Sequence, residues 1–444
     1  MNKEFAKDIL NKIKNKNVDL AEVYHVSSSG TKIDIHSQNV ESIDNISSAG
    51  VGIRVINKNR LGFAFTSNMI PEKINEAISE AINNSNDACD DKNNVMSFPS
   101  KSSFKDCIFD EEIAKTSIEK KIEIAKKVES TAYAYDKRVK NTEKVSYSDG
   151  EYNIIIMNSN GVDIEYKGTS CGVFAEVIAS SNGENEAGFG VDFKMFLNKV
   201  DVEKAGIEAA TRAVELLGAK TVNSGKMSLI MEPFIAVQFL DVISDLISAD
   251  MVQKGKSLLA GKIGEIIATK LLSIVDNGIL PGGIGSSPYD CEGIPSQKTV
   301  IVENGVLKSF IYNTYTASKG STKSTGNAVR GSFKTTPGIG TTNFYIEQGK
   351  SNPADIIKTV KNGLIVKRVM GMHTVNPITG EFSVGASGIL IENGEITFPV
   401  RGITIAGNLI DFLRSIQAVG NDLKFIGSSG SPTLLISDIA VSGS

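Results

Sequence analysis

Four polar side chains recur at three- and four-residue steps within residues 233–255: Gln238, Asp241, Asp245 and Ser248. On a helix, residues at this spacing lie one turn apart, so their side chains are neighbours. Two carboxylates one turn apart have the chemistry of a catalytic acid pair or of half a metal site. The same pattern describes the solvated face of an ordinary helix, which is the commoner case. Both interpretations stay open on these residues alone.

Three polar, glycine-rich segments form a second candidate site: residues 324–331, 376–388 and 403–408. Glycine permits close approach of another backbone, and small hydroxyl groups offer hydrogen bonds. This composition favours a groove that binds an extended peptide by strand addition. Tight turns at the corners of a closed barrel would explain the same glycines. The predicted groove residues are Ser324, Thr325, Gly326, Asn327, Gly385, Ala386, Ser387 and Gly388.

The elements that must position these residues differ between the two halves of the chain. From about residue 20, short alternating apolar runs predict an antiparallel meander, with polar turns at residues 27–30 (SSSG) and 57–60 (NKNR). Helical spacing recurs near residues 3–16, from Pro71, from Thr116 and over residues 202–217. Residues 1–224 are therefore predicted to form an α+β domain.

Glycine becomes denser after Lys226, where strand and turn patterns dominate. Asn304-Gly305 and Asn393-Gly394 each stand between two alternating runs, which predicts two tight hairpins. Residues 233–255 are predicted to form one helix that begins at Pro233. Residues 225–444 are therefore predicted to form a β-rich, barrel-like domain, and the domain boundary is predicted near residues 224–227. The polar stretch 85–112 is predicted to be a long, exposed surface excursion.

Composition excludes several classes of protein. A net charge of −4 and an isoelectric point near 5.7 provide no electrostatic footprint for direct nucleic-acid or membrane binding. No apolar run is long enough to span a bilayer, and the N-terminus has no signal-peptide pattern, so a cytoplasmic location is expected. The four cysteines form no CxxC pair, and no two of the three histidines lie within ten residues of each other. A zinc site built on a helical histidine pair is therefore excluded.

The second half of the chain contains a series of distinctive segments in a fixed order. They include IVDNGILPGGIGSSPYDCEG (274–293), VIVENGVLKSFIYN (300–313), STGNA (324–328), NPITGEFSVGASG (376–388) and PTLLISDIAVSGS (432–444). In their order and wording, these segments resemble the TldD/PmbA family. The resemblance covers residues from about Met227 to the end, and the N-terminal meander supports it more weakly.

The resemblance implies a metalloprotease system for unfolded peptides and for peptide maturation, which also carries the label of modulator of DNA gyrase. TldD-type members hold zinc with a His-Glu-x-x-x-His helix and a later cysteine, whereas PmbA-type (TldE-type) members lack these ligands. Aligned at Gln253-Lys254-Gly255, this chain has Leu240, Asp241 and Asp245 at the His, Glu and His positions, and no cysteine follows Cys291. The resemblance therefore implies a PmbA-type subunit with no catalytic residues, no metal and no cofactor of its own.

The implied partner is a TldD-type catalytic subunit in a heterodimer, with a homodimer as the alternative, and the implied substrate is an unfolded peptide. Two other functions stay open at this point. The chain could be a stand-alone peptidase with a non-standard site, or a non-proteolytic module that binds peptides or regulates gyrase.

Overall fold

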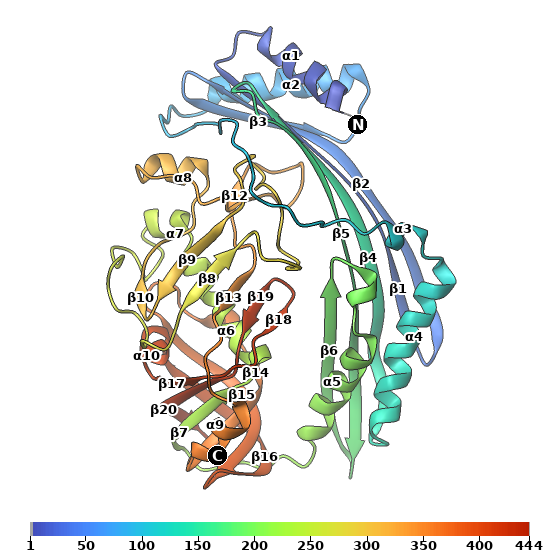
Figure 1. Ribbon diagram of the computed structural model, residues 1–444, viewed down its shortest axis with the longest axis vertical. Helices are drawn as coiled ribbons and strands as arrows, with labels where there is room; N and C mark the ends of the chain where they lie inside the picture. The colour runs from blue at the N-terminus through green and yellow to red at the C-terminus, as the bar shows by residue number, and fades with distance from the viewer. Residues whose placement is uncertain (1–2, 444) are drawn as a thin grey trace.

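A six-stranded antiparallel sheet forms most of the N-terminal half and curves around the C-terminal half (Figure 1). The computed structural model describes residues 3–443. The strand order is β3-β2-β1-β4-β5-β6. The strands are β1 (Leu20–His36), β2 (Asn39–Asn57), β3 (Arg60–Thr66), β4 (Val139–Asn158), β5 (Asp163–Ser181) and β6 (Glu184–Lys194).

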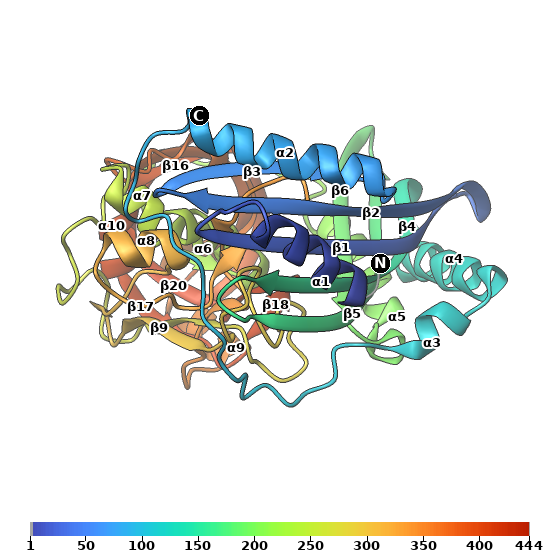
Figure 2. The same ribbon diagram turned by 90° about the horizontal axis from the view of Figure 1, so that it is seen from above.

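Helices cover one face of this sheet at both ends, and Figure 2 shows α1 and α2 lying over one of them. Val23 and Ile33, both on β1, belong to the two separate cores that these helices close. Because side chains alternate along a strand, Tyr24 points to the opposite face, toward the C-terminal half. The helices are α1 (Lys3–Lys14), α2 (Pro71–Asp87), α3 (Glu111–Lys115), α4 (Ile118–Tyr135) and α5 (Val202–Glu215), with the short η1 (Leu197–Lys199).

The turn predicted at residues 27–30 is wrong, because these residues lie inside β1. Ser28 pairs with Ser48 on β2 and with Tyr152 on β4, so strands hold it on both sides. A β-carbon on Gly30 would lie 2.3 Å from the carbonyl oxygen of Asp149. Gly30 therefore serves the close approach of β4 rather than a turn. The turn predicted at residues 57–60 is confirmed between β2 and β3.

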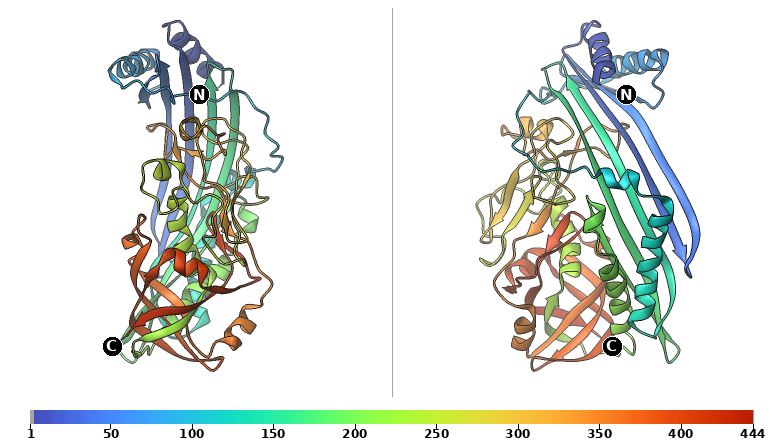
Figure 3. Two further views of the ribbon diagram at one scale, coloured as in Figure 1. Left: turned by 90° about the vertical axis from the view of Figure 1, so that its left-hand side faces the viewer. Right: turned by 45° about the vertical axis from the view of Figure 1, so that its right-hand side comes forward.

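The C-terminal half contains a closed barrel of five strands, which Figure 3 shows beside the long sheet. β16 pairs with β20 as well as with β15, and this second pairing closes the barrel. The predicted fold class, α+β with a β-rich, barrel-like C-terminal domain, is thus confirmed. The barrel strands are β7 (Gly225–Met231), β14 (Asn362–Met370), β15 (Glu381–Glu392), β16 (Glu395–Asn408) and β20 (Leu434–Ser442), and β17 (Ile416–Val419) pairs with β20.

Another six-stranded sheet, built of shorter strands and here called the smaller sheet, extends from the barrel toward the N-terminal end of β1 (Figure 1), with the order β10-β9-β8-β13-β19-β18. β11 and β12 form a separate two-stranded sheet. Both predicted hairpins are confirmed: β9 and β10 meet at Asn304-Gly305, and β15 and β16 meet at Asn393-Gly394, all with positive φ. The remaining strands are β8 (Ile274–Asn277), β9 (Lys298–Glu303), β10 (Val306–Leu307), β11 (Ala328–Val329), β12 (Gly338–Ile339), β13 (Phe344–Ile346), β18 (Lys424–Ile426) and β19 (Ser429–Ser431).

The single helix predicted over residues 233–255 is two helices, α6 and α7. At the break, the backbone of Ile311 donates to the carbonyl of Ile247 and accepts from the N–H of Ala249, both at 3.0 Å. Within residues 3–443, no helix combines the length and apolar character needed to cross a bilayer. The C-terminal helices are α6 (Pro233–Leu246), α7 (Ala249–Gln253), α8 (Thr314–Lys319), α9 (Pro353–Thr359) and α10 (Leu409–Arg414), with the short η2 (Met372–Thr374).

Residues 88–110, here called the strap, connect α2 to α3 and cross between the two halves (Figure 1). The strap is less exposed than predicted, because Met96 and Ser97 are buried. The Ser97 hydroxyl donates to the backbone carbonyl of Glu292, and the Asn158 amide donates to the carbonyl of Ser97 at 2.9 Å. Beyond this anchor the strap is exposed again, with 70% of Phe98 accessible.

Trypsin is expected to cut the strap first, at Lys101 or Lys105, because both lie in its exposed part. The predicted domain boundary offers Lys226, but this residue already pairs with Ala440 inside the barrel sheet. Limited digestion followed by mass spectrometry of the fragments tests this order. First cleavage at Lys226 would show that the predicted boundary is more mobile than the strap. The division into two domains near residue 224 stays a prediction.

Candidate functional site

The three zinc-helix positions of α6 do not share one environment. Leu240 is only 1% exposed and packs in the main C-terminal core. Asp241 and Asp245, in contrast, are exposed. The structure therefore brings the two carboxylates together and leaves the third position in the core.

Asp241 is tied to the smaller sheet by one hydrogen bond, because the Ser429 hydroxyl donates to Asp241 Oδ1 at 2.8 Å. Partial burial and the charge of Asp245 raise the pKa of Asp241, although the bond from Ser429 acts in the opposite direction. The two carboxylates thus repel each other. One hydroxyl donor is the partner that the structure provides for Asp241.

The predicted groove residues of the 324–327 loop are largely engaged with their own chain. The Ser324 hydroxyl donates to the carbonyl of Tyr312 at 3.0 Å, and Thr325 Oγ1 accepts from the Tyr312 N–H at 2.8 Å. The Asn327 amide donates to Asp276 Oδ2 at 2.6 Å. Burial raises the pKa of Asp276 to about 6, against the hydrogen bonds that stabilise its charged form. Gly326 and Asn327 nevertheless line a cleft, described below.

The other predicted groove segment, residues 385–388, lies inside the barrel. β15 is a central strand there, with Gly388 paired to Val366 of β14 on one side and to Val400 of β16 on the other. Ser387 is buried. Strand addition at Gly385–Gly388 is therefore wrong, because both edges of the strand already carry partners. The alternative, glycines needed by a closed barrel, describes this segment.

A cleft of about 300 Å³ separates the sheet from the C-terminal half. Tyrosines of β1, β4 and β5 line one wall, and the 326–330 segment lines the other. Ser428 also lines this cleft, and the next residue, Ser429, is the one that donates to Asp241 of α6. The tyrosines are Tyr24, Tyr152 and Tyr166.

One set of contacts between the two halves lies at β6, α5 and the start of α6. Arg368 Nη1 lies 2.9 Å from Glu186 of β6, and Lys367 Nζ lies 2.8 Å from Glu215 of α5. The Arg212 guanidinium stacks over Phe234 of α6, 4.7 Å from the ring centroid. The cleft therefore lies between two sets of contacts that fix its width.

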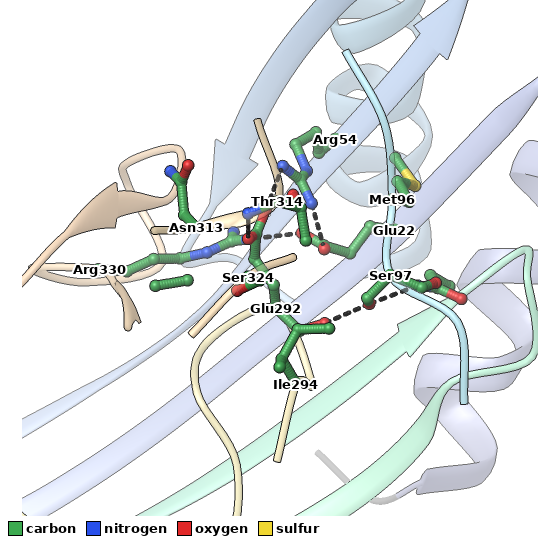
Figure 4. A network of polar contacts seen from close by, with 12 residues as sticks. Glu22, Arg54, Met96, Ser97, Glu292, Ile294, Asn313, Thr314, Ser324 and Arg330 are labelled. Carbon is green, nitrogen blue, oxygen red and sulfur yellow. Dashed lines mark hydrogen bonds and ion pairs between the residues drawn. The ribbon is translucent and has the colours of Figure 1, made fainter. Parts of the chain in front are cut away.

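A buried cluster of two arginines and two glutamates forms the other set of contacts (Figure 4). The β1–β2 register places Glu22 opposite Arg54 on the inner face of the sheet. Arg54 Nη2 donates to Glu22 at 2.7 Å, and Arg54 Nη1 donates to Glu292 of the C-terminal half at 3.1 Å. Arg330 Nη2 pairs with the second oxygen of Glu22. All four side chains are at most 6% exposed.

Local hydrogen bonds orient Glu292 in this cluster. Asp290 Oδ1 accepts from the N–H groups of Glu292 and Ile294, both at 2.9 Å, which shapes the turn. Thr314, at the start of α8, donates its N–H and its hydroxyl to the two Glu292 oxygens at 2.8 and 2.6 Å. Every carboxylate oxygen of Glu292 thus has a donor.

The cluster combines two positive guanidinium groups with two carboxylates, and the pKa of Glu22 shows the effect of this pairing. Burial alone would raise the pKa of Glu22, but the Arg330 and Arg54 guanidinium groups hold it below its ordinary value. Burial and the Glu292 carboxylate raise the pKa of the neighbouring Asp290 to about 7. Arginine and threonine donors bind the carboxylates of Glu22 and Glu292, so these contacts act as a clamp between the two halves.

Sequence reasoning missed this clamp, although a pattern for half of it exists. Glu22 interrupts the apolar run AEVYHV, and Arg54 interrupts VGIRVI, so each is a single charge within an apolar strand. Charges at such positions are seldom buried unless they are paired. Pairing these two strands would have placed one opposite the other, but nothing local identifies Glu292 or Arg330.

Comparisons with known proteins agree along the chain. Family models match residues 21–85 as "PmbA/TldA metallopeptidase domain 1", residues 111–217 as the central domain and residues 224–443 as the C-terminal domain. The "Metalloprotease PmbA" of Escherichia coli O157:H7 is 28% identical, over 96% of this chain and 92% of that protein.

Two solved structures share the fold over nearly the whole length. A candidate modulator of a DNA gyrase from Thermotoga maritima is 30% identical with a TM-score of 0.91, over 99% of each chain. TldE from Thermococcus kodakarensis is 25% identical with a TM-score of 0.89, over 99% of this chain and 100% of that one. The chain belongs to the TldD/PmbA family.

The zinc that TldD-type members bind does not fit the residues of this TldD/PmbA chain. Leu240 has no donor atom and is packed in the core, and two carboxylates cannot replace two imidazoles and a thiolate. Within residues 3–443, no group of three or more His, Cys, Asp and Glu side chains is arranged to hold a metal ion.

Proposed function

We propose that this chain is a PmbA-type subunit of a TldD/PmbA metalloprotease system. In this proposal it binds no zinc, acts in the cytoplasm and works with a TldD-type chain that holds the metal. The observation that carries the proposal is the placement of Leu240 in the core at the first zinc-ligand position. A histidine there would need a different packing of α6 to reach a metal.

The substrate of the assembled system is an unfolded peptide that is degraded or matured. The cleft of about 300 Å³ supports this role, because tyrosines line one wall and the 326–330 segment lines the other. Tyrosine rings offer apolar area together with a hydroxyl, which suits varied peptide sequences. The clamp and the ion pairs at α5 and β6 hold the two walls of the cleft at a fixed separation. Nucleic acid is not a direct partner in this proposal.

The purified chain is expected to contain only substoichiometric zinc and to hydrolyse no unfolded peptide by itself, because it lacks the ligand set. With a tagged TldD-type chain from the same genome, it should co-purify, and the complex should hydrolyse the peptide. Elemental analysis and a casein-derived peptide assay measure the two outcomes. One zinc per chain together with hydrolysis by the chain alone would overturn the proposal.

A matched control assigns the chemistry to one subunit. Replacing the first histidine of the partner's zinc helix should abolish hydrolysis while the complex still forms. Replacing Asp241 by asparagine in this chain should leave hydrolysis within about two-fold, since among residues 3–443 the Asp241 carboxylate has only a hydroxyl partner. A large loss from Asp241→Asn would instead show that this chain supplies a reacting group.

A further inference from the structure

The clamp borders a second cavity besides the cleft. This cavity, here called the clamp cavity, has a volume of about 570 Å³, which is the size of a small-molecule site. Glu292 lines the clamp cavity, whereas the two residues before it, Asp290 and Cys291, line the cleft. Among residues 3–443, none lines both hollows. The clamp cavity is therefore a site of its own.

Arg54 contributes an unused hydrogen-bond donor to the lining of the clamp cavity. Its two terminal nitrogens donate to Glu22 and Glu292, but its buried Nε–H has no acceptor within residues 3–443. Arg54 is only 5% exposed, so the group is shielded from bulk solvent. Buried donors without a partner are rare, because each one costs free energy. A ligand that brings an oxygen acceptor into the cavity would satisfy this donor.

The charges around the clamp cavity disfavour an anionic ligand. Three acids and two bases line it, which gives a net charge of −1. Arg54 is already paired with Glu22 and Glu292, and the second base, Lys254, lies 2.7 Å from Asp250. A phosphate or a carboxylate would therefore meet no cation without a counter-charge, and the acceptor that suits Arg54 is a neutral carbonyl. The three acids are Asp91, Asp250 and Glu292.

Asp91 is the one acid of this lining that has no ion pair within residues 3–443. Its carboxylate accepts from the Asn93 N–H at 2.9 Å and from the Tyr315 hydroxyl at 2.8 Å. These hydrogen bonds hold the pKa of Asp91 below its ordinary value, so it carries a negative charge at neutral pH. A positive group of a ligand would find its counter-charge here.

The clamp cavity also has an apolar wall. Ile56 of β2 and Leu61 of β3 are cross-strand partners, and Val95 of the strap and Ile339 of β12 line the cavity with them. Leu61, Val95 and Ile339 are half-buried, so part of their apolar surface stays uncovered. Ligand sites are commonly lined in this way, by apolar side chains and a few polar groups that orient the ligand. A branched aliphatic side chain suits this wall.

We propose that the clamp cavity binds the amino-terminal end of an apolar peptide. The ammonium group pairs with Asp91, the first aliphatic side chains lie against Leu61 and Val95, and a backbone carbonyl accepts from Arg54 Nε. The rest of the peptide leaves toward solvent, because Cys89 and Gly338 line the cavity and are exposed. This inference does not depend on the proposed function, because it concerns binding by this chain alone.

Leu-Leu-amide is the probe, since it has a free ammonium group, two aliphatic side chains and no carboxylate. Titration calorimetry with the full chain is expected to show one site. The N-acetylated probe lacks the charge, and 3-methylbutylamine is leucinamide without its carbonyl group. Acetylation of the probe, and removal of the carbonyl from leucinamide, should each weaken binding by about ten-fold or more, because each removes a hydrogen bond to a charged group. No binding at about 1 mM Leu-Leu-amide, or equal binding of its acetylated form, would overturn the proposal.

Two native cysteines report where the probe binds. Cys89 lines the clamp cavity, whereas Cys107 is exposed farther along the strap and is not part of the lining. Bound Leu-Leu-amide should slow alkylation of Cys89 by iodoacetamide and leave the rate at Cys107 unchanged. Peptide mass spectrometry over a time course measures both rates in the unmodified chain. Binding that protects neither thiol, or both to the same extent, would place the probe elsewhere and overturn the proposal.

Two variants test the wall and the acid separately. Leu61→Trp should fill part of the cavity and weaken binding of Leu-Leu-amide by about ten-fold or more, and Asp91→Asn should weaken the probe but not its acetylated form. Phe65→Trp on the same strand and Asp90→Asn are the matched controls, because neither Phe65 nor Asp90 lines the cavity. Thermal melting checks that all four fold, and the alkylation rates of the unmodified chain decide if one does not. Leu61→Trp and Asp91→Asn chains that bind the probe as the controls do would contradict the proposed site.

Discussion

Arg54→Met is expected to lower the free energy of unfolding by roughly 3–5 kcal/mol, the usual effect of removing one member of a buried ion pair. Arg54 donates to both Glu22 and Glu292, so its loss leaves two buried carboxylates short of a counter-charge. Methionine keeps most of the side-chain volume, which limits the contribution of a cavity. Urea unfolding followed by circular dichroism measures the change.

An exposed pair provides the control for this variant. Lys73 lies 2.6 Å from Glu76 on α2, and both side chains are about half exposed. Lys73→Met should therefore change stability by less than about 1 kcal/mol. If Arg54→Met costs no more than Lys73→Met, water reaches the Glu22–Arg54–Glu292 contacts and the clamp is not a desolvated one.

Gly388→Val is expected to destabilise the C-terminal half by about 3 kcal/mol or more, at the upper end of what overpacking costs. A β-carbon at this position would lie 2.2 Å from the carbonyl oxygen of Ile365 on the neighbouring strand. β14 and β15 would have to separate, and the barrel would lose its closure. Thermal melting and far-ultraviolet circular dichroism should show the loss.

Gly225→Val is the matched control, because Gly225 also lies in a barrel strand but has open space where a β-carbon would stand. It should melt close to the unmodified protein. A stable Gly388→Val variant would contradict the packing described here. If that variant also lost peptide hydrolysis in the assembled complex, the groove predicted from the sequence would regain support.

Short-range features of the fold were predictable because their causes are local. Asn-Gly at 304–305 and 393–394 favours the positive φ angles that a two-residue hairpin needs, and both hairpins form. Residues 27–30 have turn composition as well, but strands on both sides hold them extended. The outcome there depends on residues more than 100 positions away in β4, which no local pattern reveals.

The candidate site also has features that local sequence predicts and features that depend on distant residues. The exposure of Asp241 and Asp245 follows from helical spacing, and so does the burial of Phe239. Residue spacing did not distinguish the roles of the two glycine-rich segments. Gly326 serves a turn beside Pro295, whereas Gly388 allows a close contact between strands. Only the tertiary arrangement shows which of them faces a cleft.

The pairing of Glu22 with Arg330 spans 308 residues, and this separation matters during synthesis of the chain. Ribosomes add about 5–20 residues per second, so roughly 15–60 s pass between the appearance of the two partners. During that interval the inner face of the growing sheet, with Glu22, Tyr24 and Arg54, has no C-terminal half to cover it. We therefore expect chaperone binding to matter most while the N-terminal half is complete and the C-terminal half is still being synthesised.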